Sequence, residues 1–516
     1  MRSSFMGLET SKRGLFTQQS ALYTTGHNIS NANTLGYSRQ RVNMEATAGH
    51  PGVGLNAGTM PGFLGTGVQA GSIQRIRDGF VDHQYRQEST KLGYWDTTSK
   101  AISQMEDVLT EPSHYGLQKS LSEFWSSLQD LAANPENNGA RAVVARRGEA
   151  VADSFNYMHR SLKEIQTNLG KEIGITTKDI NSILKQIAGL NDQIAKVEPN
   201  GYMPNDLYDA RDLLLDELSA IVPIETEYVP SGGRALAIAE GTVTVKLKLE
   251  GETVTIVNGR DFAELQTDPQ ELVEVDVNGT IINHPVEGIK VSALSTNPDG
   301  TAAGAATHNF DKFSDIGKLK SLVNSYGTTD GKGLYPEMLT KLDTMANNFM
   351  AEFNRIHQLG FTLATDGDPS VGGGLFFEDA TAGAGGIKVL QAIIDDPSLI
   401  AASIATGEEG QGANALALSN MQFTALISGA TLQTYFQGVI GELGVDGEQA
   451  QKFAYNTATL LGAVEHRRAS IISVSLDEEM TDMIRFQQAY NASARMITVV
   501  DETLDKIING MGIVGR

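Results

Sequence analysis

Apolar residues recur every seven positions near the N-terminus of the chain. A spacing of seven keeps side chains on one stripe of an α-helix and is typical of helices that pair. We therefore predict a helix over about residues 4–33. It should end where the Asn and Gly residues of 31–37 favour a turn, because both tolerate a positive φ. The stripe consists of Leu8, Leu15, Leu22 and Ile29, with Phe5, Phe16 and Tyr23 beside it.

The C-terminal end carries a longer stripe over a predicted helix at about 476–510. Ser475 and Glu478 have the spacing of a capping box, in which each side chain bonds the other residue's backbone N–H. Other apolar side chains beside the stripe are Met496, Val499 and Ile507. The stripe, whose steps alternate between four and three residues, consists of Leu476, Met480, Met483, Gln487, Tyr490, Ala494, Ile497, Asp501, Leu504, Ile508 and Met511.

The two terminal stripes allow two interpretations. Each helix could face an ordinary core, or the two helices could pair as a coiled coil and leave apolar side chains for other chains. Their position at the two ends of the chain favours the second interpretation. We hypothesise that the ends are weakly ordered in the monomer and become ordered on assembly.

Helical periodicity also dominates the middle of the chain. The longest predicted helix spans about 140–197. At ~1.5 Å per residue it would form a rod of more than about 70 Å, which suits an elongated molecule. Other helices are predicted at about 78–133, 204–220, 335–358, 413–430 and 447–470.

The pattern changes to period two between about 229 and 312. Val243, Val245 and Leu247 alternate with polar residues, and Asn258-Gly259 and Asn278-Gly279 are typical of hairpin turns. We therefore predict a mainly α, elongated multidomain protein with an inserted β domain. Its predicted parts are an N-terminal assembly segment (1–60) paired with a C-terminal helix (476–516), a helical rod in two pieces (61–228 and 313–475, with Gly-rich outer loops at 360–412) and the β domain (229–312).

Composition narrows the possible functions. The 516 residues carry a net charge of −22, from 62 acidic and 40 basic side chains, which argues against binding to nucleic acid or to anionic membranes. Residues 1–10 carry no apolar run of the length of a signal peptide's core, and no segment reaches the length of a membrane span. Cysteine is absent, which excludes disulfides, zinc–thiolate sites and cysteine nucleophiles. This absence fits a protein exported unfolded, although many cytosolic proteins are also poor in cysteine.

The sequence contains no convincing catalytic, cofactor or metal site. Residues 65–70 match a dinucleotide-binding pattern on paper, but no strand precedes them and no helix starts within them. Asp395 and Asp396 precede a proline and fit a turn better than a metal site. His357 lies in a predicted helix and is better interpreted as a structural or surface residue than as a catalyst. We therefore predict that the chain is not an enzyme.

Motifs at both ends resemble one family. Segment 28–40, Asn-Ile-Ser-Asn-Ala-Asn-Thr-Leu-Gly-Tyr-Ser-Arg-Gln, resembles the N-terminal signature of flagellar rod, hook and hook-associated proteins. Segments 475–479, Ser-Leu-Asp-Glu-Glu, and 486–495, Phe-Gln-Gln-Ala-Tyr-Asn-Ala-Ser-Ala-Arg, resemble the C-terminal signature of the same proteins. Two departures are small: Leu35 stands where many members have Pro, and Ser30 where many have Ala.

Internal segments narrow the resemblance to the hook-associated protein 1 family, whose members form the junction between hook and filament. These segments are 125–132, 205–212, 353–357 and 396–403. The resemblance implies a secreted structural subunit of the bacterial flagellum, exported unfolded by the type III apparatus and located outside the cell. It also implies four kinds of partner: further copies in a ring-like assembly, the hook protein, a second hook–filament junction protein, and a chaperone that holds the C-terminal helix before export.

Together, the stripes and the resemblance define a predicted assembly interface. It consists of Leu8, Leu15, Leu22, Ile29, Asn31, Gly36, Tyr37, Arg39, Leu476, Met480, Met483, Gln487, Tyr490, Ala494, Ile497, Leu504 and Ile508.

Two alternatives remain open. The β domain could make the chain a surface adhesin or binding module on a flagellar scaffold, or it could carry an enzyme. The second is less favoured, because the domain lacks a convergent set of His, Asp or Ser residues. Deletion of 229–312 would separate an adhesin from a junction subunit, because motility should survive the loss of an adhesin domain while binding would not.

Overall fold

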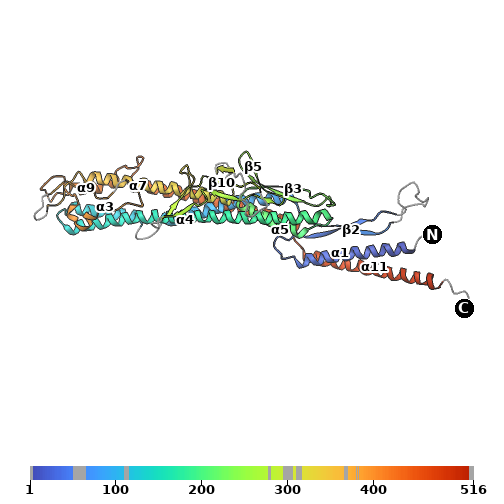
Figure 1. Cartoon of the computed structure of the whole chain (residues 1–516). Helices are drawn as coiled ribbons and strands as arrows, with labels where there is room; N and C mark the ends of the chain where they lie inside the picture. The colour runs from blue at the N-terminus through green and yellow to red at the C-terminus, as the bar shows by residue number, and fades with distance from the viewer. Residues whose placement is uncertain are drawn as a thin grey trace.

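The computed structural model shows an elongated molecule with both chain ends at one extremity (Figure 1). It is mainly α-helical with an inserted β region, as predicted. The predicted turn Asn278-Gly279 and the stripe residue Met511 lie outside the described residues. The structure describes residues 4–49, 65–109, 116–276, 281–294, 306–309, 316–364, 370–378, 381, 383–408 and 410–510.

Helix α4 is the spine of the molecule and confirms the predicted rod. It spans Asn138–Val197 and contains 60 residues. At ~1.5 Å per residue its length is about 90 Å. The Asn137 side chain caps its start by accepting from the N–H groups of Gly139 and Ala140. One face of α4 is apolar and buried along its whole length. Helix α4 packs mainly on α3 (Leu117–Ala133), α5 (Asn205–Ile221), α6 (Lys318–Tyr326) and α7 (Leu334–His357).

A second long pair is formed by α2 (Gly79–Leu109) and α10 (Leu432–Ile472), which run antiparallel. The Trp95 and Phe453 rings lie 4.5 Å apart between them. The predicted helices at 413–430 and 447–470 were placed wrongly: α9 ends at Asn420, and α10 already begins at Leu432. Within α10, Gly447 lies close to α2. A Cβ at Gly447 would lie 2.9 Å from a Glu106 oxygen and 3.1 Å from Ile102 on α2.

The β strands lie along α4 in small antiparallel sheets (Figure 1). Val243, Val245 and Leu247 are buried, so the period-two pattern correctly predicted the inward face of β4. The strands of the inserted β region begin at Ile224, before the predicted start of the β domain at about 229. The division of the chain into domains stays a prediction. The sheets are β3-β4-β5-β6 (Ile224–Val229, Thr242–Lys248, Thr253–Asn258, Asp261–Phe262), β11-β10-β7 (Ala306–Asn309, Gly288–Val291, Leu265–Asp268) and β8-β9 (Val273–Val275, Ile281–Asn283).

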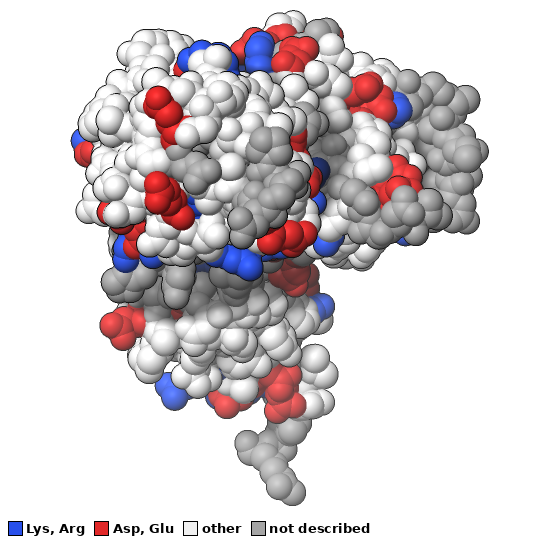
Figure 2. Space-filling model, turned by 90° about the vertical axis from the view of Figure 1, so that its left-hand side faces the viewer, with Lys and Arg blue, Asp and Glu red and all other residues white. Residues whose placement is uncertain are grey.

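The end of the body farthest from the termini, here called the tip, contains short elements around the start of α4. These are α8 (Gln391–Asp395), η3 (Pro397–Leu399), α9 (Ala413–Asn420) and η4 (Met421–Phe423). Figure 2 looks onto this end and shows scattered acidic side chains on a mostly uncharged surface. The other end of the body, here called the root, contains α5 and joins the terminal elements.

The terminal elements are two helices and one hairpin. Helices α1 (Ser4–Ser30) and α11 (Leu476–Gly510) lie side by side, and we call them the terminal pair. Strands β1 (Gln40–Ala46) and β2 (Val68–Arg75) form an antiparallel hairpin that contacts α1.

Two kinds of feature are absent from the described residues. No helix within this part of the chain is long and apolar enough to cross a membrane. Among the same residues, no group of three or more His, Asp or Glu side chains is placed to hold a metal ion.

Candidate assembly site

The terminal pair is antiparallel, and its helices approach each other most closely at Gly14. A Cβ at Gly14 would lie 3.3 Å from the Ser493 Oγ, and one at Gly7 would lie 3.8 Å from Val500. Several predicted interface residues are half-buried, namely Leu8, Leu15, Leu22 and Ile29 on α1 and Met483, Tyr490, Ala494, Ile497 and Leu504 on α11. Parts of the two predicted stripes are therefore half-buried on two helices that lie side by side.

Other predicted residues point away from the pair. Leu476, Met480, Gln487 and Ile508 are exposed. The seam of α11 is rotated relative to the predicted stripe, because Glu479, Phe486 and Val500 lie on its less exposed side.

The outer surface of the pair is unusually apolar for exposed helices. On α1, Phe5, Phe16 and Tyr23 are 63%, 54% and 72% exposed, and their spacing places them on one face. On α11, the apolar side chains that are half or more exposed include Met480, Ile484, Met496, Val499 and Ile508. Exposed apolar side chains gathered on one surface mark interaction sites in soluble proteins.

The signature segment 28–40 forms a turn that connects α1 to the hairpin. Gly36 has a positive φ of 80°, and a Cβ there would also lie 3.4 Å from Leu213 of α5. Glycine suits this position for two reasons, the positive φ and the close approach of Leu213. The half-buried Asn31 donates from Nδ2 to the His27 carbonyl at 3.1 Å and accepts from the Thr34 hydroxyl at 3.2 Å. Both contacts are local to the turn and the end of α1.

Asn28 is the centre of this segment and is only 1% exposed. Its Nδ2 donates to the Gln40 carbonyl at 2.9 Å and to the Glu479 Oε2 at 3.0 Å. Its Oδ1 accepts from the Gln40 N–H at 3.0 Å and from the Tyr37 hydroxyl at 2.7 Å. Because an amide side chain has two donor hydrogens and two acceptor lone pairs, all of its bonding capacity is used.

Tyr37 occupies a polar environment inside the turn. Its hydroxyl also lies 2.9 Å from the His27 Nδ1. Burial, together with the nearby carboxylates of Asp206, Asp209 and Glu479, raises the pKa of Tyr37 far above its usual value. The phenol therefore stays protonated and can donate its hydrogen bond to Asn28.

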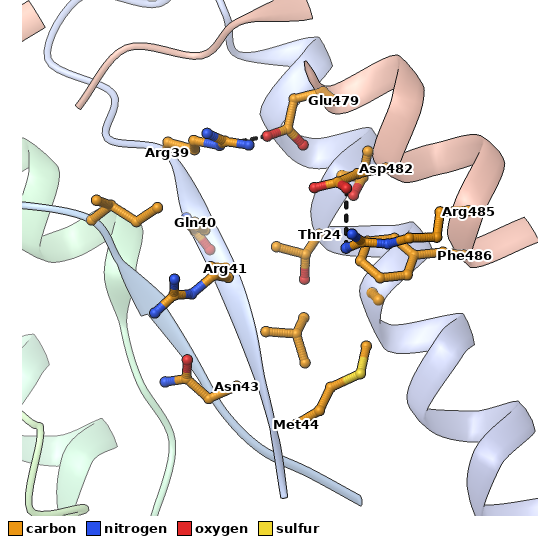
Figure 3. A pocket seen from close by; sticks show the side chains of 14 residues that line it. Thr24, Arg39, Gln40, Arg41, Asn43, Met44, Glu479, Asp482, Arg485 and Phe486 are labelled. Carbon is orange, nitrogen blue, oxygen red and sulfur yellow. Dashed lines mark hydrogen bonds and ion pairs between the residues drawn. The ribbon is translucent and has the colours of Figure 1, made fainter. Parts of the chain in front are cut away.

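Arg39 joins the signature segment to the start of α11 (Figure 3). Its Nε donates to the Glu479 Oε1 and its Nη1 to the Glu478 Oε2, both at 2.7 Å. Burial alone would lower the pKa of Arg39, but hydrogen bonds to the two carboxylates raise it above its ordinary value. The Glu478 carboxylate, which the capping-box pattern directed to the backbone, is thus engaged by an arginine instead.

A groove of about 460 Å³ lies between β1 and the terminal pair (Figure 3). Arg485, which lines it, pairs with Asp482 on α11 at 3.0 Å. The Arg41 side chain stands on its β1 side and is exposed.

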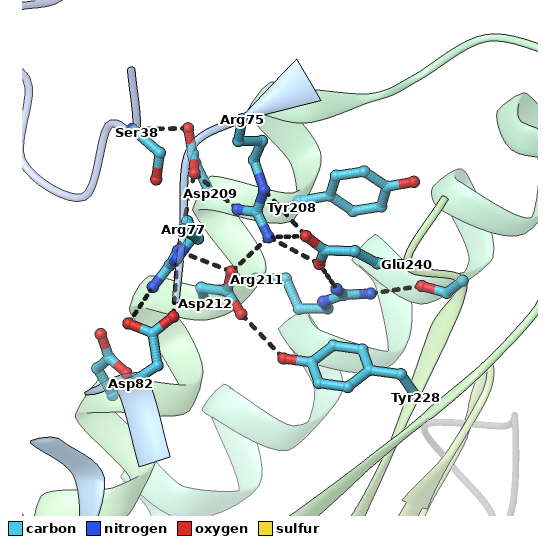
Figure 4. A network of polar contacts seen from close by, with 12 residues as sticks. Ser38, Arg75, Arg77, Asp82, Tyr208, Asp209, Arg211, Asp212, Tyr228 and Glu240 are labelled. Carbon is cyan, nitrogen blue, oxygen red and sulfur yellow. Dashed lines mark hydrogen bonds and ion pairs between the residues drawn. The ribbon is translucent and has the colours of Figure 1, made fainter. Parts of the chain in front are cut away.

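A buried ionic cluster fastens the hairpin to the body (Figure 4). Asp212 accepts from Arg75 and Arg77 at 2.7 Å and pairs with Arg86 at 3.3 Å. Burial would raise the pKa of Asp212, but these arginines outweigh burial and hold it well below its usual range. The cluster contains five cations (Arg75, Arg77, Arg86, Arg211, Arg468) and five carboxylates (Asp82, Asp209, Asp212, Asp216, Glu240), so its formal charges balance.

Neither Asn28 nor the ionic cluster was predicted as part of a site. The sequence held one usable signal, because Asp206, Asp209, Asp212 and Asp216 recur every three or four residues and form one acidic face of α5. The arginine partners of Asp209, Asp212 and Asp216 come from β2, the segment after it, α2 and α10. Nothing in the local sequence connects these elements to α5.

Comparison with known proteins gives concordant results. The family model described as "Flagellar hook-associated protein FlgK helical domain" matches residues 102–376, and "Flagellar basal body rod FlgEFG protein C-terminal" matches residues 473–510. A solved structure of the flagellar hook junction protein FlgK from Burkholderia pseudomallei has a TM-score of 0.59 and 13% identity, covering 76% of this chain and 100% of that one. At this identity the likeness supports the fold alone.

Similarity to curated relatives extends over the full length. Flagellar hook-associated protein 1 of Bacillus subtilis (strain 168) is 45% identical over 532 residues, covering 100% of both chains. The protein of the same name from Salmonella typhimurium is 24% identical, covering 96% of this chain and 98% of the relative. The full-length identity and the helical-domain match agree with the signature segments, and the chain belongs to the flagellar hook-associated protein 1 (FlgK) family.

Proposed function

We propose that this chain is a non-catalytic structural subunit that joins hook to filament by assembling through its terminal pair, with α1 and α11 acting as a coiled coil. The supporting observation is the row of exposed apolar side chains on the outer surface of the pair. Within the described chain nothing covers these side chains, and burying each large one contributes about 1.5–3 kcal/mol. Neighbouring subunits are the natural cover, since a ring repeats the same surfaces around its axis.

The proposed partners follow from family membership and from this surface. They are further copies of the chain, the hook protein and a second hook–filament junction protein. A chaperone would hold the C-terminal helix before type III export, because the exposed Met480, Ile484 and Ile508 would otherwise invite aggregation. The assembled protein would lie outside the cell on the flagellum.

The adhesin alternative receives no support from the comparisons. The similarity to the Bacillus subtilis relative covers the entire chain, so the β region is not set apart as an added module. The strands also pack on α4, the spine of the helical body.

The test replaces outer apolar side chains without touching the seam between α1 and α11. We expect Phe16→Gln with Tyr23→Gln, in a flagellated host lacking its own copy, to abolish swimming and to release filament protein into the medium. The control is Tyr455→Gln, which changes a 74% exposed aromatic residue of α10 and should leave swimming intact. Normal motility of the double variant would refute assembly through this surface.

Export must be measured in the same strains, because a variant that stays in the cell would also abolish motility. We expect the double variant to reach the medium in wild-type amounts. Amide hydrogen exchange on the purified monomer tests the related hypothesis about the ends. Residues 4–30 and 476–510 should exchange faster than α4, whereas equal protection would show that the terminal helices are ordered before assembly.

A further inference from the structure

A continuous relay of hydrogen bonds runs from α11 to the body through the side chain of Asn28. The first link joins Asn28 on α1 to Glu479 on α11 at 3.0 Å. The second joins the Asn28 amide to the backbone of Gln40, the first residue of β1. Outside this relay, the Thr17 hydroxyl of α1 donates to the Val68 carbonyl of β2 at 3.1 Å, and apolar packing adds to the contact.

The second link imitates strand pairing. The Asn28 amide donates to the carbonyl and accepts from the N–H of the same residue, Gln40, as a neighbouring strand would do. It therefore occupies the outer edge of β1 at its first residue. This pairing fixes both the distance and the angle between α1 and the hairpin, because two bonds to one residue allow little rotation.

The third link continues into α5. The Gln40 Nε2 donates to the Asp206 Oδ1 at 3.0 Å, and the Asn205 Nδ2 donates to the Gln40 Oε1 at 3.1 Å. Beside it, the Ser38 N–H donates to the Asp209 Oδ2 at 3.0 Å. The base of the hairpin is thereby fixed to the same helix that supplies most carboxylates of the ionic cluster.

The hairpin is therefore firmly attached to the body, whereas the terminal pair is attached to the hairpin through few polar contacts. Among these, Asn28 alone bonds to α11, to β1 and to the signature turn at once within the described residues. Arg39 supplies a second contact from the segment to α11, but its side chain is partly solvent-exposed. Its pair with the exposed Glu478 should contribute little, whereas its pair with the buried Glu479 is a second buried contact to α11.

We propose that Asn28 is the positioning residue that fixes the direction of the terminal pair relative to the body. This inference rests on the proposed function only for its consequence, since subunits can meet in a ring only if all their pairs point the same way. Faster hydrogen exchange than in α4 requires only transient opening of the terminal pair. The direction of the closed pair can therefore be measured on the purified monomer, and failure of this inference and failure of the proposed function are distinguishable.

The direction can be measured as a distance between two spin labels. Because the chain has no cysteine, the labels attach only where cysteine is introduced. One label goes on α11 at Gln488→Cys and its partner on α4 at Lys185→Cys, both exposed positions. A second chain carries Gln488→Cys with Lys12→Cys on α1, which reports the spacing within the terminal pair. Pulsed electron–electron double resonance then gives the α11-to-α4 and the α1-to-α11 distance distributions.

Two variants remove the relay in different ways. Asn28→Ala deletes the amide, and Asn28→Asp keeps the shape but loses both donor hydrogens and places a carboxylate against Glu479. We expect either change to broaden and shift the α11-to-α4 distribution while the α1-to-α11 distribution stays as in the wild type. The control is Asn31→Ala, whose side-chain hydrogen bonds lie within the turn and α1, and which should change neither distribution.

The outcomes separate a positioning role from a general structural one. An unchanged α11-to-α4 distribution in both Asn28 variants would overturn the proposal. A simultaneous change in the α1-to-α11 distribution, or a loss of helix by circular dichroism, would also overturn it, because Asn28 would then hold the helices themselves together.

Discussion

The tip and the root of the body are held together by opposite means. At the tip, an aromatic core joins α3, α7 and the segment after α7, with ring centroids 4.9 to 6.4 Å apart. It consists of Phe124, Phe349, Phe353, Phe376 and Phe377, all fully buried. At the root, the ionic cluster of charged side chains takes the equivalent place (Figure 4).

The two kinds of contact contribute differently: the aromatic core mainly stabilises the tip, and the ionic cluster mainly fixes the orientation of the elements at the root. Apolar burial is strong but non-directional, so it compacts the tip without requiring one orientation of its parts. Arginine–carboxylate pairs contribute less net stability when buried, but their planar fork accepts few geometries. The root is where the terminal elements join the body, and it is therefore the place where orientation matters most for an assembling subunit.

The largest effect is expected from opening the aromatic core. Phe353→Ala removes a ring whose centroid lies 5.3, 4.9 and 5.4 Å from those of Phe124, Phe376 and Phe377. The cavity should lower the free energy of unfolding by about 4 kcal/mol, measured by urea unfolding followed by circular dichroism. Phe353→Leu is the matched control and should cost less, because it leaves a smaller cavity. Equal losses in the two variants would argue against cavity formation as the cause.

The root should respond to the loss of one charge. Asp212→Asn keeps the shape of the side chain but leaves Arg75, Arg77 and Arg86 with an excess of buried positive charge. We expect a loss of about 3 kcal/mol in the free energy of unfolding, because breaking a buried pair leaves its partners uncompensated. Glu227→Gln, which breaks the solvent-exposed pair with Lys246, should leave the urea midpoint unchanged. If Asp212→Asn is as stable as the wild type, the cluster contributes orientation alone.

The comparison also explains what the sequence could and could not predict. Periodicity reports which face of an element is buried, so the apolar side of α4 and the inward face of β4 were predicted correctly. It does not report what covers that face, and it missed the first part of α10, which begins at Leu432 and not at about 447. The polar contacts of the root were missed for a stronger reason. Asn28 and Glu479 are 451 residues apart, and no local pattern connects them.

Glu478 shows the same limit on a smaller scale. Its spacing from Ser475 fits a local cap, and local sequence has no means of revealing that Arg39 competes for the carboxylate. The signature segment was identified by resemblance, but the resemblance located the turn and not the role of each side chain within it. Only the fold shows which of its residues are buried.

Acid should loosen the tip before the root. His357 is fully buried next to the aromatic core; its Nδ1 donates to the Gly374 carbonyl at 2.8 Å and its Nε2 accepts from the Ala401 N–H at 2.9 Å. Burial lowers the pKa of His357 to about 4, against about 6.5 in the unfolded chain, so the unfolded state binds more protons between these values. Stability should therefore fall as the pH drops below about 6.5, by about 2 kcal/mol at pH 5.

The root should hold through the same range. The depressed pKa of Asp212 gives stability that is present above its unfolded value near 4 and is lost only below it, while the pKa of Asp209, which burial raises, works in the opposite direction. His357→Gln can keep both hydrogen bonds without titrating, and it should remove the loss between pH 6.5 and 4. Persistence of that loss in the variant would assign it to another group.

The smallest effect is expected where the signature segment meets α11. There Arg39 binds two carboxylates, one exposed and one buried. Glu478 is 63% exposed at its side chain and Glu479 only 3%, although each binds Arg39 at 2.7 Å. Glu478→Gln should therefore cost about 0.5 kcal/mol or less, and molar salt should abolish the difference from the wild type. Glu479→Gln should cost about 1–2 kcal/mol with little salt dependence, because a buried acceptor for Asn28 and Arg39 is weakened. Equal, salt-sensitive losses in the two variants would mean that solvent reaches both carboxylates. In that case charge attraction alone would hold α11 to the signature segment, and the root would lose the directional character that distinguishes it from the tip.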